Sequence, residues 1–151
     1  MKREETVDYN IKALWHAIAR MYNQVATKHD ITTSIGFVLL NIDAVEGTPA
    51  TKIAPLMGLE SRSLTRMLKT METRNLIFKK PDLHDKRSVR IFLTEEGKKK
   101  REISVATVKS FNNDVRKAIP MNKLRIFFEV IADVNQVIDE RNKIQSEAKK
   151  K

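Results

Sequence analysis

The sequence predicts a mainly α-helical protein that carries one small β-hairpin. Only four Gly and four Pro interrupt 151 residues, a composition that favours long helices. Apolar residues recur every three or four positions over most of the chain, which is the helical period. Between residues 77 and 93 that period gives way to the alternation typical of strands. These three observations predict helices on both sides of a short hairpin.

Two helices are predicted at the N-terminal end. An apolar stripe with spacings of three and four predicts the first helix over residues 7–28. The segment 29–31 interrupts that stripe. Thr32 or Thr33 then has the side chain needed to cap a second helix, which we expect to reach Val45.

A short helix, a tight turn and a longer helix are predicted next. Thr48-Pro49 has the pattern of an N-cap and a first helical position, and Gly58 is expected to end the helix that follows. Ser61 is expected to cap a helix over residues 62–74. Asn75 would end it, because Asn tolerates the left-handed conformation. Two helices joined so closely predict a helix-turn-helix.

A hairpin and two further helices complete the predicted elements. Residues 77–80 and 88–93 predict two strands joined by a polar, charged turn. Thr94 is expected to cap a long helix that ends before Pro120, and an amphipathic helix follows. A charged hairpin directly after a helix-turn-helix is a wing, so the middle of the chain predicts a winged helix-turn-helix.

This order of elements divides the chain into four expected parts. Residues 1–46 hold the N-terminal helices, which share in the core and in dimerisation. Residues 47–97 form the winged helix-turn-helix, residues 98–142 the C-terminal dimerisation helices and residues 143–151 a basic tail that we expect to be frayed. The apolar stripes at the two chain ends are too apolar to be left in water, and the middle of the chain fills its own core. We therefore expect the two stripes to pair across a two-fold axis.

The charge of the chain indicates an anionic partner. The net charge is +10, and residues 50–101 carry fourteen basic and six acidic residues, so +8 of it lies there. Nucleic acid, an anionic membrane face and an acidic protein all fit such a domain. The apolar run 37–40 is far too short to span a membrane, and residues 1–5 are charged and polar rather than a signal peptide. We therefore expect a cytoplasmic protein.

The basic residues lie where a winged domain contacts DNA. A helix that enters the major groove needs an apolar back and a front that bears hydrogen-bond donors. A hairpin tip reaches the neighbouring minor groove, where arginine suits the negative potential. A solvated charged face would explain the helix alone, but not a basic hairpin directly after it. The predicted DNA-binding residues are Ser61, Arg62, Ser63, Thr65, Arg66 and Lys69 on the helix and Asp85, Lys86, Arg87 and Arg90 in the hairpin.

A group of short motifs between Thr48 and Gly97 is more specific than any one of them. They are Leu64-Thr65-Arg66-Met67-Leu68, Met71-Glu72, Leu76, Pro81-Asp82, Asp85-Lys86-Arg87, Val89-Arg90 and Leu93-Thr94-Glu95-Glu96-Gly97. Together they resemble the core of the MarR family of bacterial regulators, and the flanking helices extend the resemblance to nearly the whole chain. The resemblance implies a homodimer, interlocked through its first and last helices, whose two winged domains bind a palindrome of double-stranded DNA.

The resemblance also implies roles for particular residues. It places Asp85 and Arg87 in the wing motif and Thr65 and Arg66 in the major groove. Three residues depart from the family pattern: Pro55 stands where a charged residue is common, Asn75 replaces the usual Gly, and Arg62 replaces a small residue and alters the expected base preference.

The resemblance further implies a small-molecule effector, since the family often binds small phenols or other acids beside the first, second and fifth helices. Trp15, His16 and Arg20 are the residues expected to line such a site. The competing interpretation is that Trp15 packs against neighbouring side chains and that His16 is merely exposed.

No motif for catalysis or for a cofactor is found in the sequence. The chain has no Cys, and His16, His29 and His84 lack the spacing of metal ligands. It has no Gly-rich phosphate loop and no Gly-x-Ser-x-Gly elbow. We therefore expect a non-enzymatic transcription regulator without metal or cofactor, a repressor by default, whose possible ligand is a small aromatic or acidic effector.

The alternative function is a winged-helix scaffold that binds a protein rather than DNA. The basic front of the predicted helix 62–74 argues against it, because a protein-binding face should be more apolar.

Overall fold

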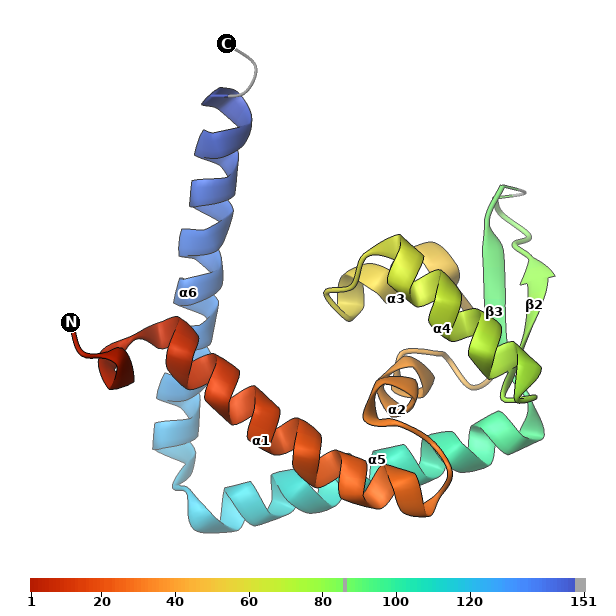
Figure 1. Cartoon of the computed structure of the whole chain (residues 1–151), viewed down its shortest axis with the longest axis horizontal. Coiled ribbons are helices and arrows are strands. Elements are labelled where there is room, and N and C mark those ends of the chain that lie inside the picture. Colours follow the sequence, from red (N-terminus) through yellow and green to blue (C-terminus); the bar gives the residue numbers. More distant parts are fainter. Residues whose placement is uncertain (86, 149–151) are drawn as a thin grey trace. The chain divides into compact units, whose positions relative to one another are not determined.

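The computed structural model describes residues 1–85 and 87–148, which form six α-helices, one short 3₁₀-helix (Arg3–Glu5) and a three-stranded sheet. Their contacts group the chain into two compact units, residues 1–108 and residues from 109 onward. Figure 1 labels the main elements. The helices are α1 (Val7–Lys28), α2 (Thr33–Leu40), α3 (Ala50–Leu56), α4 (Ser61–Thr73), α5 (Glu95–Ala118) and α6 (Met121–Ala148), and the strands are β1 (Thr48–Pro49), β2 (Ile77–Pro81) and β3 (Val89–Leu93). The predicted fold class, mainly helical with a small β wing, is confirmed.

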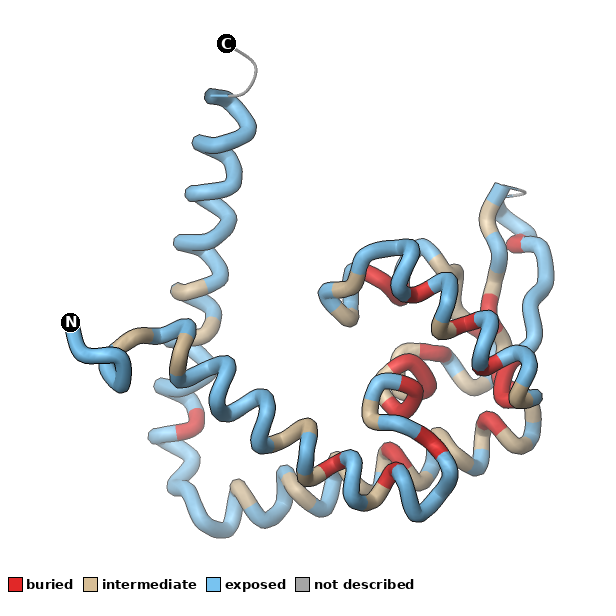
Figure 2. The backbone as a smooth tube through the Cα atoms, viewed as in Figure 1, coloured by how far each residue is buried: buried red, intermediate tan, exposed pale blue. Residues whose placement is uncertain are grey.

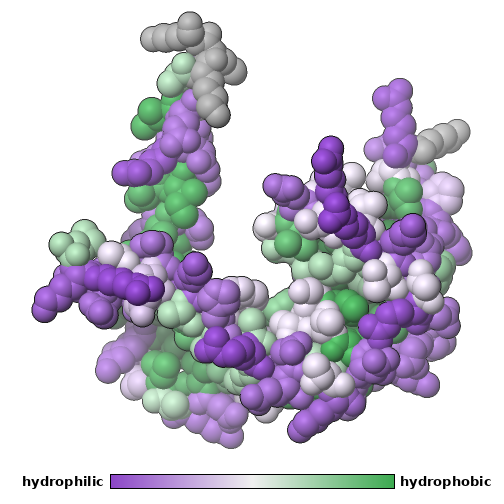
Figure 3. Space-filling view, viewed as in Figure 1, coloured by the Kyte–Doolittle hydropathy of each residue, from purple (hydrophilic) through white to green (hydrophobic). Residues whose placement is uncertain are grey.

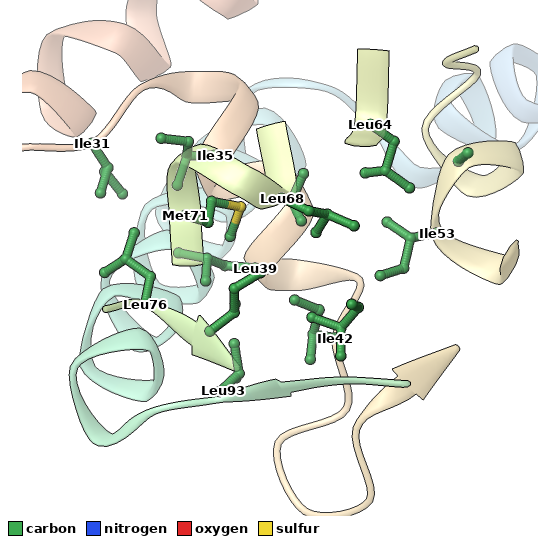
Figure 4. Packing of buried hydrophobic residues seen from close by; sticks show 14 of the residues in the cluster. Ile31, Ile35, Leu39, Ile42, Ile53, Leu64, Leu68, Met71, Leu76 and Leu93 are labelled. Carbon is green, nitrogen blue, oxygen red and sulfur yellow. The ribbon is translucent and has the colours of Figure 1, made fainter. Parts of the chain in front are cut away.

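The core of the first unit is built around α2. Val38 and Leu39 of this helix and Ile42 just after it are fully buried, and α3, α4 and the strands contribute the residues that pack on them. Figure 2 shows buried positions on these elements, and Figure 4 shows their side chains in one cluster. Because α2 is apolar beyond its first turn, most of its surface must be covered by other elements. The core thereby fixes the helix-turn-helix and the hairpin in one unit.

The second helix is shorter than predicted. Thr32 caps it as expected, since its Oγ1 accepts a hydrogen bond from the Ile35 amide at 3.2 Å. The helix ends at Leu40, well before the predicted Val45. Asp43 holds a turn there, because its Oδ1 accepts the amides of Val45 and Glu46 at 2.8 Å each. An Asp that bonds its own following amides offers the backbone an alternative to the helix.

Residues Thr48 and Pro49 form a strand that the sequence analysis did not predict. They pair antiparallel with Ile91 and Arg90 of β3, which gives the sheet the order β1-β3-β2. The helix α3 runs from Ala50 to Leu56, so its start agrees with the prediction, but its N-cap is Pro49 and not Thr48 as predicted. A two-residue strand has no alternation for a sequence pattern to reveal, and it exists only because β3 lies beside it.

The remaining helix ends confirm some expectations and correct others. Asn75 has φ 55° and ends α4, and Thr94 caps α5 by accepting the Gly97 amide at 2.9 Å, both as predicted. The helix α4 begins at Ser61 itself, with Glu60 as its N-cap. The helix α6 continues to Ala148, so residues 143–148 are helical where we expected a frayed tail. Among the described residues, no helix combines the length and apolar character needed to cross a membrane.

Candidate nucleic-acid interface

The helix α4 has a buried apolar back and an exposed polar front. Leu64, Leu68 and Met71 are 3%, 4% and 0% exposed, and they hold the helix against the core. Figure 3 shows strongly hydrophilic side chains projecting from α4 and from the hairpin. All six residues that we predicted on this helix lie on its exposed front: Ser61, Arg62, Ser63, Thr65, Arg66 and Lys69.

The cations on the front of α4 are available to a partner. Within the described residues, Arg62, Arg66 and Lys69 have no ion-pair partner. Thr65 differs from them, because its hydroxyl donates to the carbonyl of Ser61 at 2.8 Å. Its proton is therefore used inside the helix, and only its lone pairs and methyl group remain for a ligand.

The hairpin is held in shape by the buried carboxylate of Asp82, whose side chain is 4% exposed. It accepts the amides of His84 at 2.9 Å and Asp85 at 3.1 Å, and the Nε of Arg90 at 2.9 Å. The guanidinium of Arg90 also donates to the carbonyls of Glu46 and Gly47, at 3.2 Å each. Arg90 therefore joins the wing to the loop before β1, and its predicted contact with DNA would compete with three structural hydrogen bonds.

The tip of the hairpin presents Arg87. Its side chain is exposed, and its backbone amide donates to Asp85 Oδ1 at 3.0 Å. The carboxylate of Asp85 thus orients the backbone of the turn rather than a guanidinium. Leu83, which sequence reasoning did not single out, is 91% exposed near the same tip. Lys86, which we predicted to bind DNA, lies outside the described residues.

The wing carboxylate has a depressed pKa. The amide of His84, the amide of Asp85 and the guanidinium of Arg90 hold the pKa of Asp82 below its usual 3.8, against the opposing effect of burial. A carboxylate with a lowered folded-state pKa stabilises the fold above the unfolded pKa and loses that contribution as the pH falls.

We expect Asp82→Asn to lower the urea midpoint of unfolding at neutral pH, because an amide cannot accept from Arg90 and from both backbone amides at once. The gap in unfolding midpoint between variant and wild type should narrow as the pH falls below 3.8, where the carboxylate is protonated in the unfolded chain. It should close once the pH passes the lowered pKa of the folded state, where the native carboxylate is protonated too. Urea titrations at several pH values measure this gap. Asp85→Asn, at an exposed carboxylate of the same turn, is the control, and a gap independent of pH would contradict this role for Asp82.

A recess opens between α1, α2 and α5 in the first unit. It is shallow, since most of the roughly 350 Å³ of empty space within it is open to solvent, and it is lined by Tyr22, Val25, Ala26, Ile31, Thr33, Gly36, Phe37, Leu40, Ile103, Ser104, Thr107 and Val108. It lies beside the three helices that the family resemblance implied. The predicted lining residues Trp15, His16 and Arg20 are exposed and do not line it. Trp15 lies at its edge, with its ring centroid 5.5 Å from that of Phe37.

The turn between α1 and α2 contacts both the recess and the end of α4. Asp30, at φ 55°, forms an ion pair with Arg74 at 2.8 Å, and Arg74 also donates to its carbonyl. Lys100 of α5 donates to the carbonyl of His29 at 2.8 Å. Ile31, next along this turn, lines the recess. A physical connection therefore runs from the recess to the helix that carries the basic front.

Comparisons with known sequences agree with this architecture. The model of the MarR family matches residues 31–89. The HTH-type transcriptional regulator SarZ of Staphylococcus aureus (strain USA300) is 31% identical over 115 residues, which are 73% of this chain and 78% of SarZ. The HTH-type transcriptional regulator TtmR of Methylorubrum extorquens is 32% identical over 90 residues, which are 60% of this chain. The match spans only 46% of TtmR, less than half of that relative.

Comparisons with solved structures show the fold. The PcaV transcriptional regulator of Streptomyces coelicolor, solved with its natural ligand, superposes with a TM-score of 0.76 at 18% identity, over 90% of this chain and 96% of PcaV. MepR of S. aureus, solved in complex with DNA, superposes with a TM-score of 0.75 at 19% identity, over 89% of this chain and 98% of MepR.

Proposed function

Because the chain belongs to the MarR family, whose members regulate transcription, we propose that it binds a palindromic operator as a homodimer and represses the adjoining genes. It is a DNA-binding transcription regulator and not an enzyme. The observation that carries the proposal is that one compact unit holds two cationic elements. They are the front of α4, whose cations have no ion-pair partner within the described residues, and the arginine at the tip of the hairpin.

The two elements serve different grooves. Arg62, Arg66 and the other predicted residues on the front of α4 enter the major groove, where side-chain donors distinguish base pairs. Arg87 enters the adjacent minor groove, which carries less sequence information but whose narrow A·T segments attract arginine. Arg90 positions the wing from behind rather than contacting bases, since its guanidinium is bonded to Asp82. MepR, a neighbour of the same fold, is solved with DNA, which supports this mode of binding.

The dependence of DNA affinity on salt tests the proposal. If each subunit places about four to five cations on phosphates, the dimer releases counterions from about eight to ten phosphates. A plot of the logarithm of the DNA association constant against the logarithm of the salt concentration should then have a slope of about −7 to −9. Fluorescence anisotropy of labelled genomic fragments at increasing salt measures it. A slope shallower than about −3 would contradict the extended basic surface. Absence of DNA binding by folded protein would favour the protein-binding scaffold instead.

Exposed apolar side chains support the homodimer. In the first unit, the N-terminal half of α1 exposes Val7, Ile11, Leu14 and Trp15 by 43–53%, although the other half packs against α2. In the second unit, α6 exposes Ile126, Phe127, Phe128, Val130, Val137, Ile138 and Ile144 by 46–66%. Patches of this kind are typical of surfaces that an obligate partner covers.

We expect sedimentation equilibrium to show a dimer at micromolar concentration. Phe128→Asp should shift it toward monomer, because a carboxylate in an apolar interface loses its hydration without a partner. Asn122→Asp, which adds the same charge to α6 at an exposed polar residue on another face of the helix, is the matched control. A monomeric wild type would overturn the proposed assembly.

A ligand in the recess would regulate DNA binding by a population shift. In one form of the dimer, the distance between the two winged domains does not match the distance between the operator half-sites. A molecule that binds this form more tightly releases the DNA. The contacts of the α1–α2 turn with Arg74 and Lys100 support this coupling, because they join the wall of the recess to α4 and α5. PcaV, another neighbour of this fold, is solved with its natural ligand. The recess is not lined by Trp15, His16 or Arg20. These residues stay predicted contacts only for a part of the ligand that extends outside the recess.

A further inference from the structure

The far end of the hairpin exposes apolar side chains as well as charged ones. Leu83 is 91% exposed, the highest exposure of any leucine among the described residues. Val89, which is 40% exposed, pairs across the ladder with Pro81, which is exposed too. Figure 1 shows the hairpin projecting past α3 and α4. Three apolar residues therefore lie in water at the part of the wing that enters DNA in the proposed function.

The fold itself does not require a leucine at position 83. The turn is closed by Asp82, whose side chain accepts the amides of His84 and Asp85 and whose own amide donates to the carbonyl of Ser88 at 3.0 Å. These bonds involve the neighbours of Leu83 and not its side chain, which at 91% exposure packs against almost nothing. A polar residue would allow the same turn and expose less apolar surface, so the leucine is available to a partner.

The alternation along the strands shows which side of the wing the apolar pair occupies. Residues two apart in a strand share a face, so Val89 shares one with Ile91 and Leu93, which are buried. Pro81 likewise shares its face with Ile77, which is buried on the other strand. This face packs on the core that also holds the back of α4. The pair Pro81 and Val89 therefore lies on the α4 side of the wing, beyond the point where the core ends.

We propose that Leu83, with Pro81 and Val89 behind it, packs against the deoxyribose sugars that wall the minor groove when Arg87 enters that groove. The proposal rests on the proposed function, which brings the wing to DNA. Continuity with Arg87 is the argument for DNA as the occupant, because the amide of Arg87 is bonded within the same short turn. The sugar edges present C–H surface, and leucine is among the side chains that minor-groove-binding proteins place between the walls.

This contact gives the wing two kinds of affinity that respond differently to salt. Burial of apolar surface releases no counterions, so the contribution of Leu83 is independent of the salt concentration. Arg87 brings a positive charge to a polyanion, so its contribution falls as salt is added. Two residues of one turn can therefore be distinguished by a single kind of titration.

Fluorescence anisotropy of the purified full chain on a labelled A·T-rich duplex, at several salt concentrations, tests the proposal. We expect Leu83→Ala to lower the DNA association constant about threefold to tenfold for each wing, at every salt concentration and with an unchanged slope. Arg87→Ala should instead make the salt slope shallower by about 1 for each wing. Leu83→Met, which keeps an apolar side chain of similar volume, should retain the wild-type affinity.

Val45→Ala is the matched control, because Val45 is an apolar side chain exposed by 86% outside the hairpin. The register pairs Thr48 with Ile91 and Pro49 with Arg90, so the chain before Thr48 runs toward the base of the hairpin and away from its tip. This variant should bind DNA as the wild type does. Urea unfolding of each variant verifies that it is folded.

The outcomes separate this inference from the proposed function. If the wild type binds DNA and Leu83→Ala binds equally well, the inference is overturned and the proposed function stands, and the leucine is then left for a protein partner. A loss in Leu83→Ala that comes with a shallower salt slope would overturn it as well, because the substitution would then have displaced Arg87. An equal loss in Val45→Ala would show that the effect is not a contact at the tip. A folded wild type that binds no DNA overturns both proposals.

Discussion

Replacing Arg87 with Ala should weaken DNA binding by about 1–3 kcal/mol for each wing, and hence by about 2–6 kcal/mol for a dimer that uses both. The side chain is exposed at the tip of a hairpin whose backbone Asp82 and Asp85 hold in place, so it needs no rearrangement to enter a groove. Because the minor groove distinguishes base pairs poorly, the loss should be similar on operator and on A·T-rich competitor DNA. Binding titrations on both DNAs measure it.

Substitutions on α4 should behave differently and so serve as the comparison. At least one of Arg62→Ala, Thr65→Ala and Arg66→Ala should reduce the preference for operator over mutated operator, because these residues face base edges or nearby phosphates. Neither class should change helicity or dimerisation, since these side chains lie away from the buried back of the helix. If Arg87→Ala binds like wild type, or if no α4 variant changes the specificity ratio, the two surfaces are wrongly assigned.

Gly97→Ala should destabilise the fold by about 3 kcal/mol, although Ala in place of Gly within a helix normally stabilises by about 1 kcal/mol. A Cβ at this position would overlap the carbonyl oxygen of Leu76 and lie 3.0 Å from its carbonyl carbon. That carbonyl cannot move away cheaply, because it accepts the amide of Thr94 at 3.1 Å, and the neighbouring Asn75 carbonyl accepts the Thr94 hydroxyl. Urea unfolding followed by circular dichroism measures the loss.

Gly58→Ala is the control for this prediction. Gly58 has φ 60°, but a Cβ there would have no heavy atom within 4 Å. The substitution should therefore cost only the left-handed backbone strain of about 1–2 kcal/mol. If the two variants lose equal stability, the close approach of α5 to Leu76 does not limit residue size at position 97. The contrast matters for function, because this approach joins α5 to the start of the wing.

The local sequence pattern was sufficient to predict those features that depend on residues close together in the chain. The stripe over 7–28 predicted α1 with both bounds correct, and Asn75 and Thr94 marked helix ends that the structure confirms. These features depend on side chains and amides within four residues of one another, so sequence alone reports them. The same holds for the basic front of α4, which follows from helical spacing once the apolar back is known.

Contacts between distant segments decided the rest. Thr48-Pro49 is a strand because β3 lies beside it, and α2 ends early because Asp43 forms a turn that competes with the helix. Arg90 had the same sequence signature as Arg87, yet the structure bonds it to Asp82 and to the carbonyls of Glu46 and Gly47. The sequence shows that a side chain is charged, but it does not show whether a hydrogen-bond acceptor lies beside that side chain in the folded protein. That information exists only after the chain has folded.

By itself, then, the sequence determined the helical class, the order of the central elements, the basic character of the DNA-binding half and the family. Each of these four properties depends on the types of residues and on their spacing along single elements, which the sequence shows directly. Among the residues that the structure describes, only the tertiary structure decided which cations lack an ion-pair partner and which support the wing. It also decided that the recess is lined by Phe37, Thr107 and their neighbours rather than by Trp15, His16 and Arg20. The physical reason is that a pocket is the space between helices that their side chains do not fill. The register in which the three helices pack determines which side chains line that space.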